Sequence, residues 1–418
     1  MTGSARHEAL ALLRERSFAS FAAARLAASA AQAMFTLVIG WHITEISASP
    51  ALHIGGLGLV RLVPALVLGL YAGAIADSFD RKRIVLLTQI VPLLCSIVLL
   101  ATTISHTVTM TVIYAVVLIV GVASAFEGPA RQALLPALVS RERFQRAITF
   151  NQIVGGVAGP TGALLGGVLI SRFDVGGAYA GHVVLLALSA LGIALLRPRP
   201  IEGTRRAVSF EAIREGLSFV WHRQTLLGPM TLDLFAVIFA GATALLPLYA
   251  REILHAGPAG LAILTAAAEI GTLVTALVLV LLPPVQRAGR ALMLAIAVFG
   301  LGTIAFGLSR SFPLSVALYA LVGAADQVGL VMRHTTVQMT TPDELRGRVS
   351  SVASLFSNSS NRIGDAESGF VAAATSATFA VVSGGMACVA IVGVVAATMP
   401  GLRNYRVTPE REKASSST

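Results

Sequence analysis

The sequence predicts an all-α membrane protein with twelve transmembrane helices, arranged as two pseudo-symmetric six-helix bundles. Of its 418 residues, 55% are hydrophobic and only 12% are charged, whereas about a quarter of the residues of a soluble protein are charged. Apolar stretches of about 20 residues, the length that crosses a bilayer, recur twelve times along the chain. A pattern of glycines and charged residues also repeats at an offset of 202 positions. Together these observations exclude a soluble enzyme.

The twelve apolar stretches predict the helices in order. They cover residues 18–42, 53–76, 84–104, 108–127, 147–171, 176–196, 226–250, 258–282, 291–309, 312–333, 349–373 and 376–400. The first stretch follows a polar N-terminus and lacks the short apolar core and cleavage site of a signal peptide, so we expect it to be retained. The longest hydrophilic segment follows the sixth stretch and divides the helices six and six.

That hydrophilic segment, residues 198–225, is the expected cytoplasmic connector between an N-terminal bundle (1–197) and a C-terminal bundle (226–402). It begins with prolines and then places Phe210, Ile213 and Leu217 at helical spacing, which predicts a short amphipathic helix on the membrane surface. A regulatory element and an inert connector are both compatible with this pattern. Residues 403–418 predict a disordered cytoplasmic tail.

An internal repeat supports the division into two similar halves. A shift of 202 positions places Gly162 on Gly364. The same shift aligns two copies of a charged pattern. In each copy a Glu stands eleven positions after an Arg, and a second Arg stands four positions after the Glu. The pattern comprises Arg131, Glu142 and Arg146 in the first half and Arg333, Glu344 and Arg348 in the second. Halves related by an axis along the membrane normal can rock around a central site.

The basic residues predict the orientation of the chain. With both termini inside, 25 of the 31 Lys and Arg residues fall on cytoplasmic segments, and only Arg172, Arg251 and Arg310 fall on the opposite side. This asymmetry is the one that the positive-inside rule describes. The net charge of +10 therefore marks the cytoplasmic face. It does not predict a nucleic-acid partner, because the basic residues are divided among separate segments instead of forming one patch.

Ionisable residues inside the predicted spans are costly, by about 2.5 to 3.5 kcal/mol each on insertion scales, and therefore mark candidate functional sites. They are Arg25, Arg61, Glu127, Asp233, Glu269, Asp326, Arg362, Asp365 and Glu367. Glu269 and Asp326 lie near mid-span, where an apolar environment favours the neutral form of a carboxylic acid. Each is either a proton carrier or a protonated group hydrogen-bonded to a neighbouring helix, whereas Asp233 lies shallow enough to reach water. The third, sixth, ninth and twelfth spans carry no charge, as expected of helices on the lipid-facing exterior.

The eleventh span is the most polar. At 100° per residue, Asn358, Asn361, Arg362, Asp365 and Ser368 share one face, which predicts a stripe that lines a cavity. Arg362 and Asp365 are three positions apart, so a static ion pair is the alternative. Glu367 falls on the other side of the helix, so we expect it to pair with a neighbouring helix or to lie near the outer interface, and its functional role and that of Arg61 stay open.

Metal binding, cysteine chemistry and direct coupling to ATP lack the residues that they need. The histidines in or near spans stand singly, without metal-ligand spacing; they are His42, His53, His106, His182 and His334. Cys95 and Cys388 lie in apolar stretches. No Walker A sequence occurs that would couple the protein to ATP. We therefore expect no metal and no cofactor, with the proton motive force as the energy source.

Between the second and third predicted helices stands Gly73-Ala-Ile-Ala-Asp77-Ser-Phe-Asp80-Arg81-Lys82-Arg83. It resembles the loop motif of the major facilitator superfamily, G-x-x-x-D-R-x-G-R-K/R-x. The resemblance implies that Gly73 lets two helices approach, that Asp77 meets a helix N-terminus, and that Arg81 and Arg83 form ion pairs that favour the outward-open state. Asp80 departs from the pattern, and an acidic residue there is similar to the drug and siderophore exporter branch.

Two further segments carry the same resemblance. Gly128-Pro-Ala-Arg131-Gln-Ala-Leu-Leu-Pro136 resembles a signature of that exporter branch. Gly155-Gly-Val-Ala-Gly159-Pro160-Thr-Gly162 is similar to the glycine-proline motif associated with exporters. The alternative for the second segment is a helix-packing motif without directional meaning.

The resemblance implies a proton-coupled antiporter that exports a siderophore of the enterobactin type or a hydrophobic drug by alternating access. We expect a monomer in a bacterial inner (plasma) membrane, with a small-molecule substrate. The arginines suit an anionic, hydroxyl-rich ligand, and the expected cavity residues are Arg25, Glu269, Asp326, Asn358, Arg362 and Asp365. An importer or a lysophospholipid flippase with the same fold remains an alternative function. A non-transporting receptor is a further alternative, which the mid-membrane carboxylates disfavour.

Overall fold

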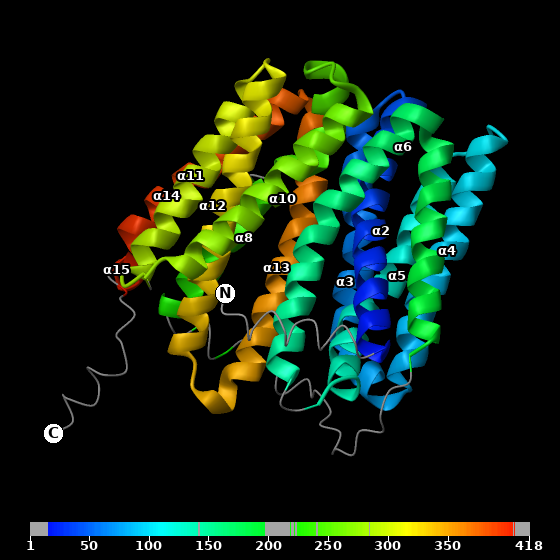
Figure 1. Cartoon of the computed structure of the whole chain (residues 1–418). Coiled ribbons are helices and arrows are strands. Elements are labelled where there is room, and N and C mark those ends of the chain that lie inside the picture. The colour runs from blue at the N-terminus through cyan, green and yellow to red at the C-terminus, as the bar shows by residue number, and fades with distance from the viewer. Residues whose placement is uncertain are drawn as a thin grey trace. The chain divides into compact units, whose positions relative to one another are not determined.

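The computed structural model describes residues 16–140, 143–196, 218, 221, 224–239, 241–283, 285–403 and 405. In these residues all regular secondary structure is helical (Figure 1). The long helices are α2 (Arg16–Ile46), α3 (Pro50–Ser78), α4 (Arg81–Ile104), α5 (Met110–Leu134), α6 (Phe144–Ala194), α8 (Gln224–Phe239), α10 (Gly257–Leu281), α11 (Ala288–Leu308), α12 (Phe312–Thr340), α13 (Asp343–Ala374) and α14 (Ala377–Thr398). The short elements are η1 (Leu135–Ala137), η3 (Ala242–Leu245), α9 (Leu246–Leu248), η4 (Tyr249–Ile253) and α15 (Pro400–Arg403).

Ten stretches of the described chain are long and apolar enough to cross a membrane, one of them running from α8 through η4. Another of the ten is α6, whose 51 residues would extend about 75 Å as one helix, far more than a bilayer of about 30 Å. Its backbone leaves helical geometry at Phe173 and Asp174, where φ is −137° and 56°. It therefore supplies two spans, at the place that the sequence predicted. The 32-residue α13 is long enough to span but polar, and completes the predicted twelve.

Several helices begin after a capping residue, whose side chain accepts hydrogen bonds from the first backbone N–H groups of the helix. Asp80 accepts from the N–H groups of Lys82 and Arg83 at the start of α4, at 2.9 and 3.2 Å. Thr109 and Ser376 do the same for α5 and α14. Asp77 lies inside the last turn of α3. The side chain of Asp77 lies outside the described part of the chain, and the acidic residue three positions later, Asp80, caps the start of α4.

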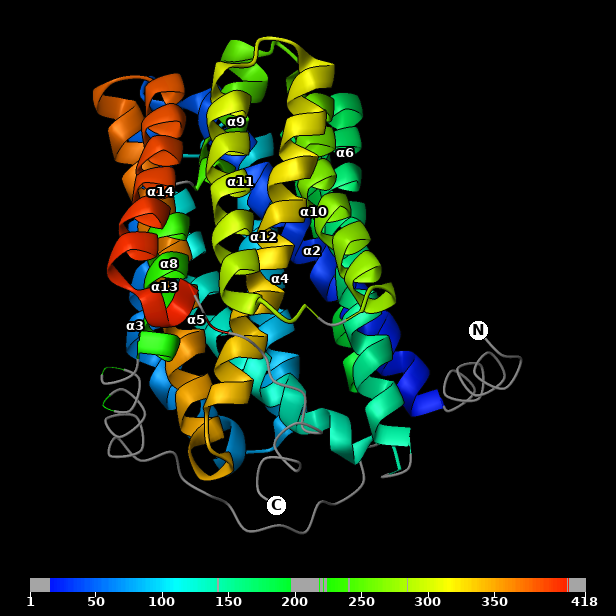
Figure 2. The same ribbon diagram turned by 90° about the vertical axis from the view of Figure 1, so that its left-hand side faces the viewer.

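The chain divides into two compact units. Unit 1 comprises Met1–His53, Leu59–Val208 and Pro247–Ala266, and unit 2 comprises Ile54–Gly58, Ser209–Leu246 and Ala267–Thr418. Within unit 1, α6 packs against α2 and α4, and α4 packs against α5. Within unit 2, α11 packs against α12 and α14, and α8 packs against α13 and α14, as Figure 2 shows. The predicted amphipathic helix and most of the predicted tail lie outside the described residues.

Glycines at repeat-equivalent positions make close helix contacts in both units. A Cβ added to Gly162 on α6 would overlap the backbone of Ala30 on α2. A Cβ on Gly364 of α13 would overlap the backbone of Val237 and Ile238 on α8. The two glycines are 202 positions apart, and each packs its helix against the first helix of its own half. The sequence repeat therefore corresponds to the same packing arrangement in both units.

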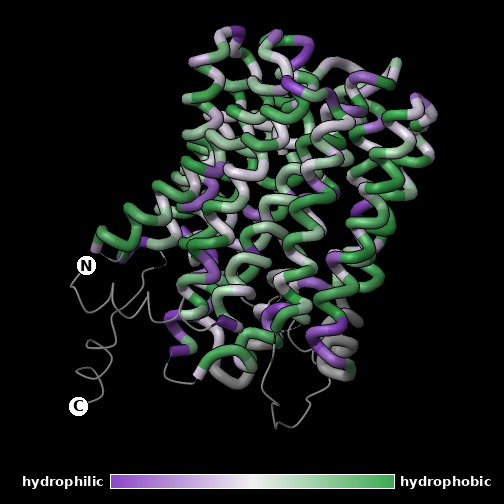
Figure 3. The backbone as a smooth tube through the Cα atoms, turned by 45° about the vertical axis from the view of Figure 1, so that its right-hand side comes forward, coloured by the Kyte–Doolittle hydropathy of each residue, from purple (hydrophilic) through white to green (hydrophobic). Residues whose placement is uncertain are grey.

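Large apolar side chains are exposed along the helices that the sequence placed on the exterior. They include Leu87 of α4, Val184 of α6, Leu294 of α11 and Phe379 of α14, each more than half exposed. In Figure 3 the hydrophilic positions gather toward helix ends and interrupt the hydrophobic length at few places. An apolar exterior of this extent is suited to lipid, since monomeric soluble proteins rarely expose large apolar patches.

Two helices extend further than the sequence predicted. The fourth and tenth spans were expected to end at residues 127 and 333, but α5 continues to Leu134 and α12 to Thr340. Arg131 and Arg333, counted among the cytoplasmic loop residues, are 7% and 8% exposed inside these helices. The apolar pattern stops at a charge, whereas the helix continues because each charge is paired.

Candidate functional site

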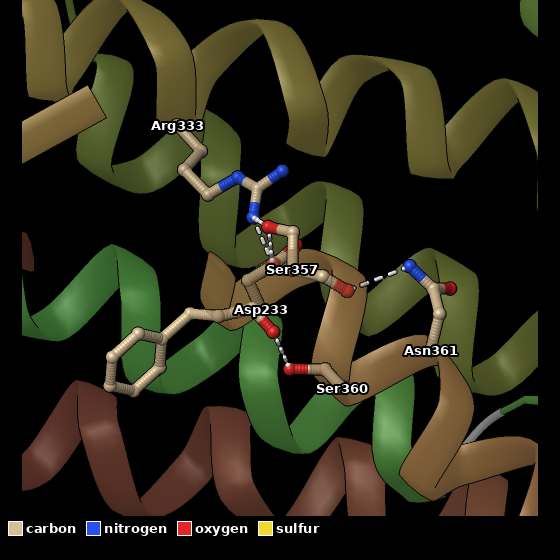
Figure 4. Close-up of polar contacts among 6 residues, drawn as sticks. Asp233, Arg333, Ser357, Ser360 and Asn361 are labelled. Atoms are coloured by element: carbon tan, nitrogen blue, oxygen red, sulfur yellow. Dashed lines mark hydrogen bonds and ion pairs between the residues drawn. The ribbon is translucent and has the colours of Figure 1, made fainter. Parts of the chain in front are cut away.

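The best-defined polar cluster of unit 2 joins three helices (Figure 4). Arg333 on α12 forms an ion pair with Asp233 on α8. Its Nη1 also donates to Ser357 Oγ on α13 at 2.5 Å, and the Ser357 hydroxyl donates to Asp233 Oδ2 at 3.1 Å. Asp233 is thus held by a buried arginine and a serine. The Asp233 side chain, which the sequence placed shallow enough to reach water, is 19% exposed and has a defined partner on another helix.

A polar stripe runs along α12 toward this cluster. Tyr319, Asp326 and Arg333 are spaced seven residues apart, so they lie on one face of the helix. The Tyr319 hydroxyl lies 2.8 Å from Thr243 Oγ1 of η3. Asp326 interacts electrostatically with both Asp233 and Arg333. The stripe therefore adds a second carboxylate to a cluster whose arginine is already neutralised.

The predicted stripe on α13 lies in the same unit. Arg362 Nη1 and Asp365 Oδ2 are 3.5 Å apart, with side chains 39% and 23% exposed. Asn361 Nδ2 donates to the Ser357 carbonyl at 2.9 Å, which links the stripe to the Asp233 cluster. The side chain of Asn358 lies outside the described part of the chain.

Glu269 lies on α10, half-buried. Within the described residues it makes no hydrogen bond and no ion pair. A carboxylate without a fixed partner can gain and lose a proton without breaking other contacts. Glu367, whose functional role the sequence left open, receives a weak hydrogen bond from Ser368 at 3.4 Å.

Unit 1 contains a second arginine–carboxylate pair. Arg131 on α5 pairs with Glu127 one turn earlier on the same helix. Gln89 Nε2 of α4 donates to Glu127 Oε1 at 3.1 Å, and the Ser189 hydroxyl of α6 donates to Gln89 Oε1 at 3.1 Å. The Glu127 carboxylate is therefore oriented by a chain of hydrogen bonds through three helices.

Arg25 on α2 contributes a further positive charge to unit 1. Its Nη2 lies 3.3 Å from the place that a Cβ on Gly155 of α6 would occupy. Arg25 Nε and the Oδ1 of Asn151, one turn earlier on α6, are buried without a hydrogen-bond partner among the described residues. Arg25 also interacts electrostatically with Arg131. Two arginines and one carboxylate leave this part of unit 1 with an excess of positive charge.

The residues of the predicted gating motif have different partners from those expected. Arg81 Nη1 donates to the Ala133 carbonyl near the end of α5 at 3.2 Å, and Lys82 Nζ donates to the carbonyls of Ala194 and Leu196 at 2.8 and 2.7 Å. The last carbonyls of a helix lack partners within it, and cations stabilise them. Arg83 forms an exposed ion pair with Asp80 at 3.9 Å.

The structure brings together only part of the remaining predicted gate. Arg146 lies exposed near the start of α6. Glu142 lies outside the described residues, as do the side chains of Asp77, Glu344 and Arg348, and Gly73 is placed only as part of α3. In the predicted packing motif, Gly155 and Gly162 face α2, Pro160 is buried, and α6 stays helical through Gly159 and Pro160.

Sequence reasoning missed three features of these clusters. It did not predict that Asp233 meets Arg333, that Gln89 orients Glu127, or that Asp80 caps α4. An Asp at the start of a segment that leads into an apolar run is a known helix-start signal and could have identified the last of these. The first two join helices distant in the sequence, and no local pattern marks them. Among the described residues, no group of three or more His, Cys, Asp and Glu could hold a metal ion.

Comparison with known proteins agrees with this architecture. The family described as transmembrane secretion effector matches residues 7–414. The enterobactin exporter of Escherichia coli is 25% identical over 367 residues, which cover 87% of each chain. The staphyloferrin A transporter of Staphylococcus aureus is 29% identical over 144 residues, 34% of this chain and 36% of that one.

Solved structures share the fold. A crystal structure of a nucleoside transporter superposes with a TM-score of 0.75 at 13% identity, covering 91% of this chain and 99% of that one. A bacterial homologue of the human lysosomal transporter Spinster, in an inward-facing and unoccupied conformation, gives a TM-score of 0.69 at 17% identity, covering 94% and 98%. The family match spans nearly the whole chain, and the chain therefore belongs to the transmembrane secretion effector family of major facilitator superfamily membrane transporters.

Proposed function

We propose that this protein is a proton-coupled antiporter, which exports an anionic siderophore of the enterobactin type or a hydrophobic drug in exchange for protons. The carboxylates inside its helices supply proton-binding groups, and the excess positive charge around Arg25 and Arg131 suits an anionic ligand. The exporter named for enterobactin is similar to this chain over 87% of its length. These features favour an anionic siderophore over a neutral molecule as the transported substrate.

The observation that carries the proposal is that Glu269, half-buried on α10, has no hydrogen-bond or ion-pair partner in the described part of the chain. An ionised carboxylate inside a membrane is costly unless it is paired, and among the described residues Glu269 has no partner. It is therefore neutral while it faces an apolar environment and loses its proton when its surroundings become aqueous. A group that changes protonation as its access to water changes couples proton movement to alternating access.

The same proposal gives the protein a bacterial inner membrane location with both termini in the cytoplasm, as a monomer. The orientation is supported by the basic residues. Arg131 and Arg333 no longer count toward the loops, but the remaining Lys and Arg residues still fall mostly on one side of the predicted membrane, as the positive-inside rule requires.

The test uses everted membrane vesicles that contain the full-length protein and generate an acidic interior. We expect enterobactin, or failing that the hydrophobic dye ethidium, to accumulate in these vesicles and to be released when nigericin collapses the pH gradient. Glu269→Gln is expected to lower gradient-driven accumulation by at least about tenfold, the usual effect of removing a group that transfers a proton.

Glu252→Gln is the matched control, because Glu252 is another glutamate, which lies exposed in η4, the element before α10. It is expected to transport as the unaltered protein does. Absence of gradient-driven accumulation of either probe would refute the exporter. Accumulation that requires the opposite orientation of the vesicles would favour the importer, and flipping of a labelled lysophospholipid would favour the flippase.

A further inference from the structure

Three arginines fall on the side of the predicted membrane that carries few basic residues, and one of them makes a contact that the proposed function does not use. They are Arg172, Arg251 and Arg310. Arg172 is exposed on α6, and Arg310 donates to the carbonyls of Gly307 and Ser309, close to it in the sequence. Arg251, in contrast, contacts α2 at a residue 207 positions earlier.

The segment that carries Arg251 packs on helices of the N-terminal half. Residues Pro247–Ala266, from α9 into α10, lie in the sequence of the predicted C-terminal bundle but belong to unit 1 in the structure. A Cβ added to Gly40 of α2 would lie 2.8 Å from Cγ of Pro247, and a Cβ added to Gly167 of α6 would overlap the side chain of Ala262. Glycine at these two places therefore lets the segment lie directly against α2 and α6.

Arg251 adds a polar contact to this apolar packing. Its Nη1 donates to Thr44 Oγ1 on α2 at 3.2 Å. Its guanidinium carbon lies 6.0 Å from the centre of the Trp41 ring, within the range of a cation–π contact. Thr44 and Trp41 are buried, whereas Arg251 is exposed. The arginine therefore lies at the exposed edge of the contact between the segment and α2.

Both partners of Arg251 are oriented by hydrogen bonds within α2. Trp41 Nε1 donates to Glu45 Oε1 at 2.7 Å, and the Thr44 hydroxyl donates to the Trp41 carbonyl at 2.7 Å. Because the Thr44 proton is used in this way, its oxygen presents a lone pair to Arg251. The bond to Glu45 likewise fixes the orientation of the indole ring. The helix thus holds an acceptor and a ring face in place for the guanidinium.

The arginine itself comes from a fixed backbone. Its element, η4, is a single turn of π-helix, a geometry that is frequent at functional sites. The Leu254 N–H closes this turn on the Tyr249 carbonyl at 2.8 Å, and Tyr249 and Ala250 are fully buried. The side chain of Arg251 can therefore leave α2 without unfolding the turn that carries it.

We propose that Arg251, Thr44 and Trp41 form a latch, which holds the segment Pro247–Ala266 against α2 and α6 and releases it during transport. The latch lies near the last turns of α2, at the end away from the cytoplasm in the predicted orientation. The inference rests on the proposed function, because a latch has a use only if the segment moves.

The chemistry of the latch suits repeated opening. Its two partners are neutral, and its arginine is exposed, so release leaves no buried charge without a partner. The Arg333–Asp233 pair differs in this respect, because separating a buried ion pair is strongly unfavourable. Water replaces a hydrogen bond and a cation–π contact at an exposed edge at a much smaller cost.

The first test measures release of the segment without transport. The full-length protein, purified in detergent, carries Pro247→Cys together with Cys95→Ala and Cys388→Ala. The measured quantity is the rate at which the charged thiol reagent methanethiosulfonate ethylsulfonate labels the new cysteine. Pro247 is buried against α2, so labelling reports the separation of the segment from that helix.

We expect Arg251→Gln to raise this labelling rate by about tenfold, because it removes a hydrogen bond from a charged group and a cation–π contact. Arg251→Lys is expected to raise the rate less, because it keeps the charge. Arg172→Gln is the matched control, since Arg172 is an exposed arginine of the same predicted face, and should leave the rate unchanged. Equal labelling rates in Arg251→Gln and Arg172→Gln would overturn the inference.

The second test locks the segment in place. A Cβ on Gly40 would lie 3.8 Å from the Cβ of Pro247, a separation that suits a disulfide. We therefore expect Gly40→Cys with Pro247→Cys, in the same background without Cys95 and Cys388, to cross-link on oxidation. In the everted vesicles with enterobactin described above, the oxidised variant is expected to lose gradient-driven accumulation, and reduction by dithiothreitol is expected to restore it.

Pro64→Cys with Gly121→Cys is the matched control. It is also a glycine–proline pair with a Cβ separation of 3.8 Å, but it joins α3 and α5, both in the N-terminal half. We expect it to cross-link without loss of transport. A Gly40–Pro247 pair that does not cross-link, or a cross-link that leaves transport intact, would overturn the inference while the proposed function stands. Vesicles of the unaltered protein without gradient-driven transport refute the proposed function, and the labelling rates then decide the latch by themselves.

Discussion

Arg333 on α12 and Asp233 on α8, one hundred residues apart in the sequence, form a buried ion pair that Ser357 on α13 completes. The repeat-equivalent arginine, Arg131, is also buried and paired, but its partner Glu127 lies on the same helix. The repeat therefore preserves the arginine and not the carboxylate. In unit 2 the Arg333–Asp233 pair, with Ser357, connects three helices. In unit 1 both members of the Arg131–Glu127 pair lie on α5.

The first prediction concerns the stability of the Arg333–Asp233 pair. Removing one partner from a buried ion pair leaves an uncompensated charge and costs about 3 to 5 kcal/mol, whereas replacing both partners by apolar residues is often close to neutral. We expect Arg333→Met to lower the thermal midpoint strongly in detergent and Arg333→Met with Asp233→Leu to recover most of the loss. Arg310→Met, at an exposed arginine between α11 and α12, is the control. Equal destabilisation by the single and double variants would contradict the pairing.

The second prediction concerns the equivalent glycines. Gly162→Ala and Gly364→Ala each place a methyl group against backbone atoms of a neighbouring helix, and overpacking of this kind costs about 1 to 3 kcal/mol. Gly393→Ala is the matched control, because nothing lies within 4 Å of its added Cβ, and alanine favours a helix over glycine by about 1 kcal/mol. We expect the first two variants to lower the thermal midpoint and the third to leave it unchanged or raise it. A midpoint unaffected by Gly162→Ala would argue against the close approach of α2 and α6.

The third prediction concerns ligand recognition by Arg25. Its Nε is buried without a partner in the described chain, and a hydrogen bond to a charged group contributes about 1.5 to 3 kcal/mol. We expect Arg25→Gln to weaken enterobactin binding by at least about tenfold, measured by titration of the purified protein, and Arg25→Lys to retain part of the affinity because it keeps the charge. Arg172→Gln, an exposed arginine on α6, should bind normally. Identical affinities in all three variants would exclude Arg25 from the binding site.

The fourth prediction separates the two interpretations of Arg362 and Asp365. This pair is partly exposed, and exposed ion pairs contribute no more than about 1 kcal/mol, so Asp365→Asn should change the thermal midpoint little. If Asp365 carries protons, Asp365→Asn lowers gradient-driven transport in vesicles, and adding Arg362→Gln does not restore it. Recovery of transport in the double variant would instead identify a static pair whose role is mutual neutralisation.

Composition and periodicity were enough to predict the fold class of this chain. A bilayer requires continuous apolar helices, so the number of spans, the turn within α6 and the polar character of α13 can all be read along the sequence. The repeat offset of 202 also identified Gly162 and Gly364 before their equivalent contacts were known. These properties depend on neighbouring residues in the chain or on a regular spacing, and both are visible in one dimension.

Tertiary packing decided the partner of Arg333, whereas Arg131 pairs with Glu127 at a helical spacing that the sequence already shows. Arg131 and Arg333 end the apolar pattern, and only the position of a carboxylate across or along a helix explains why α5 and α12 continue past them. The links from Gln89 to Glu127 and from Ser96 to His182 likewise join different helices. A buried charge is stable only where its partner is placed by the fold, and contacts between different helices, such as that of Arg333 with Asp233, are set by packing that no local pattern encodes.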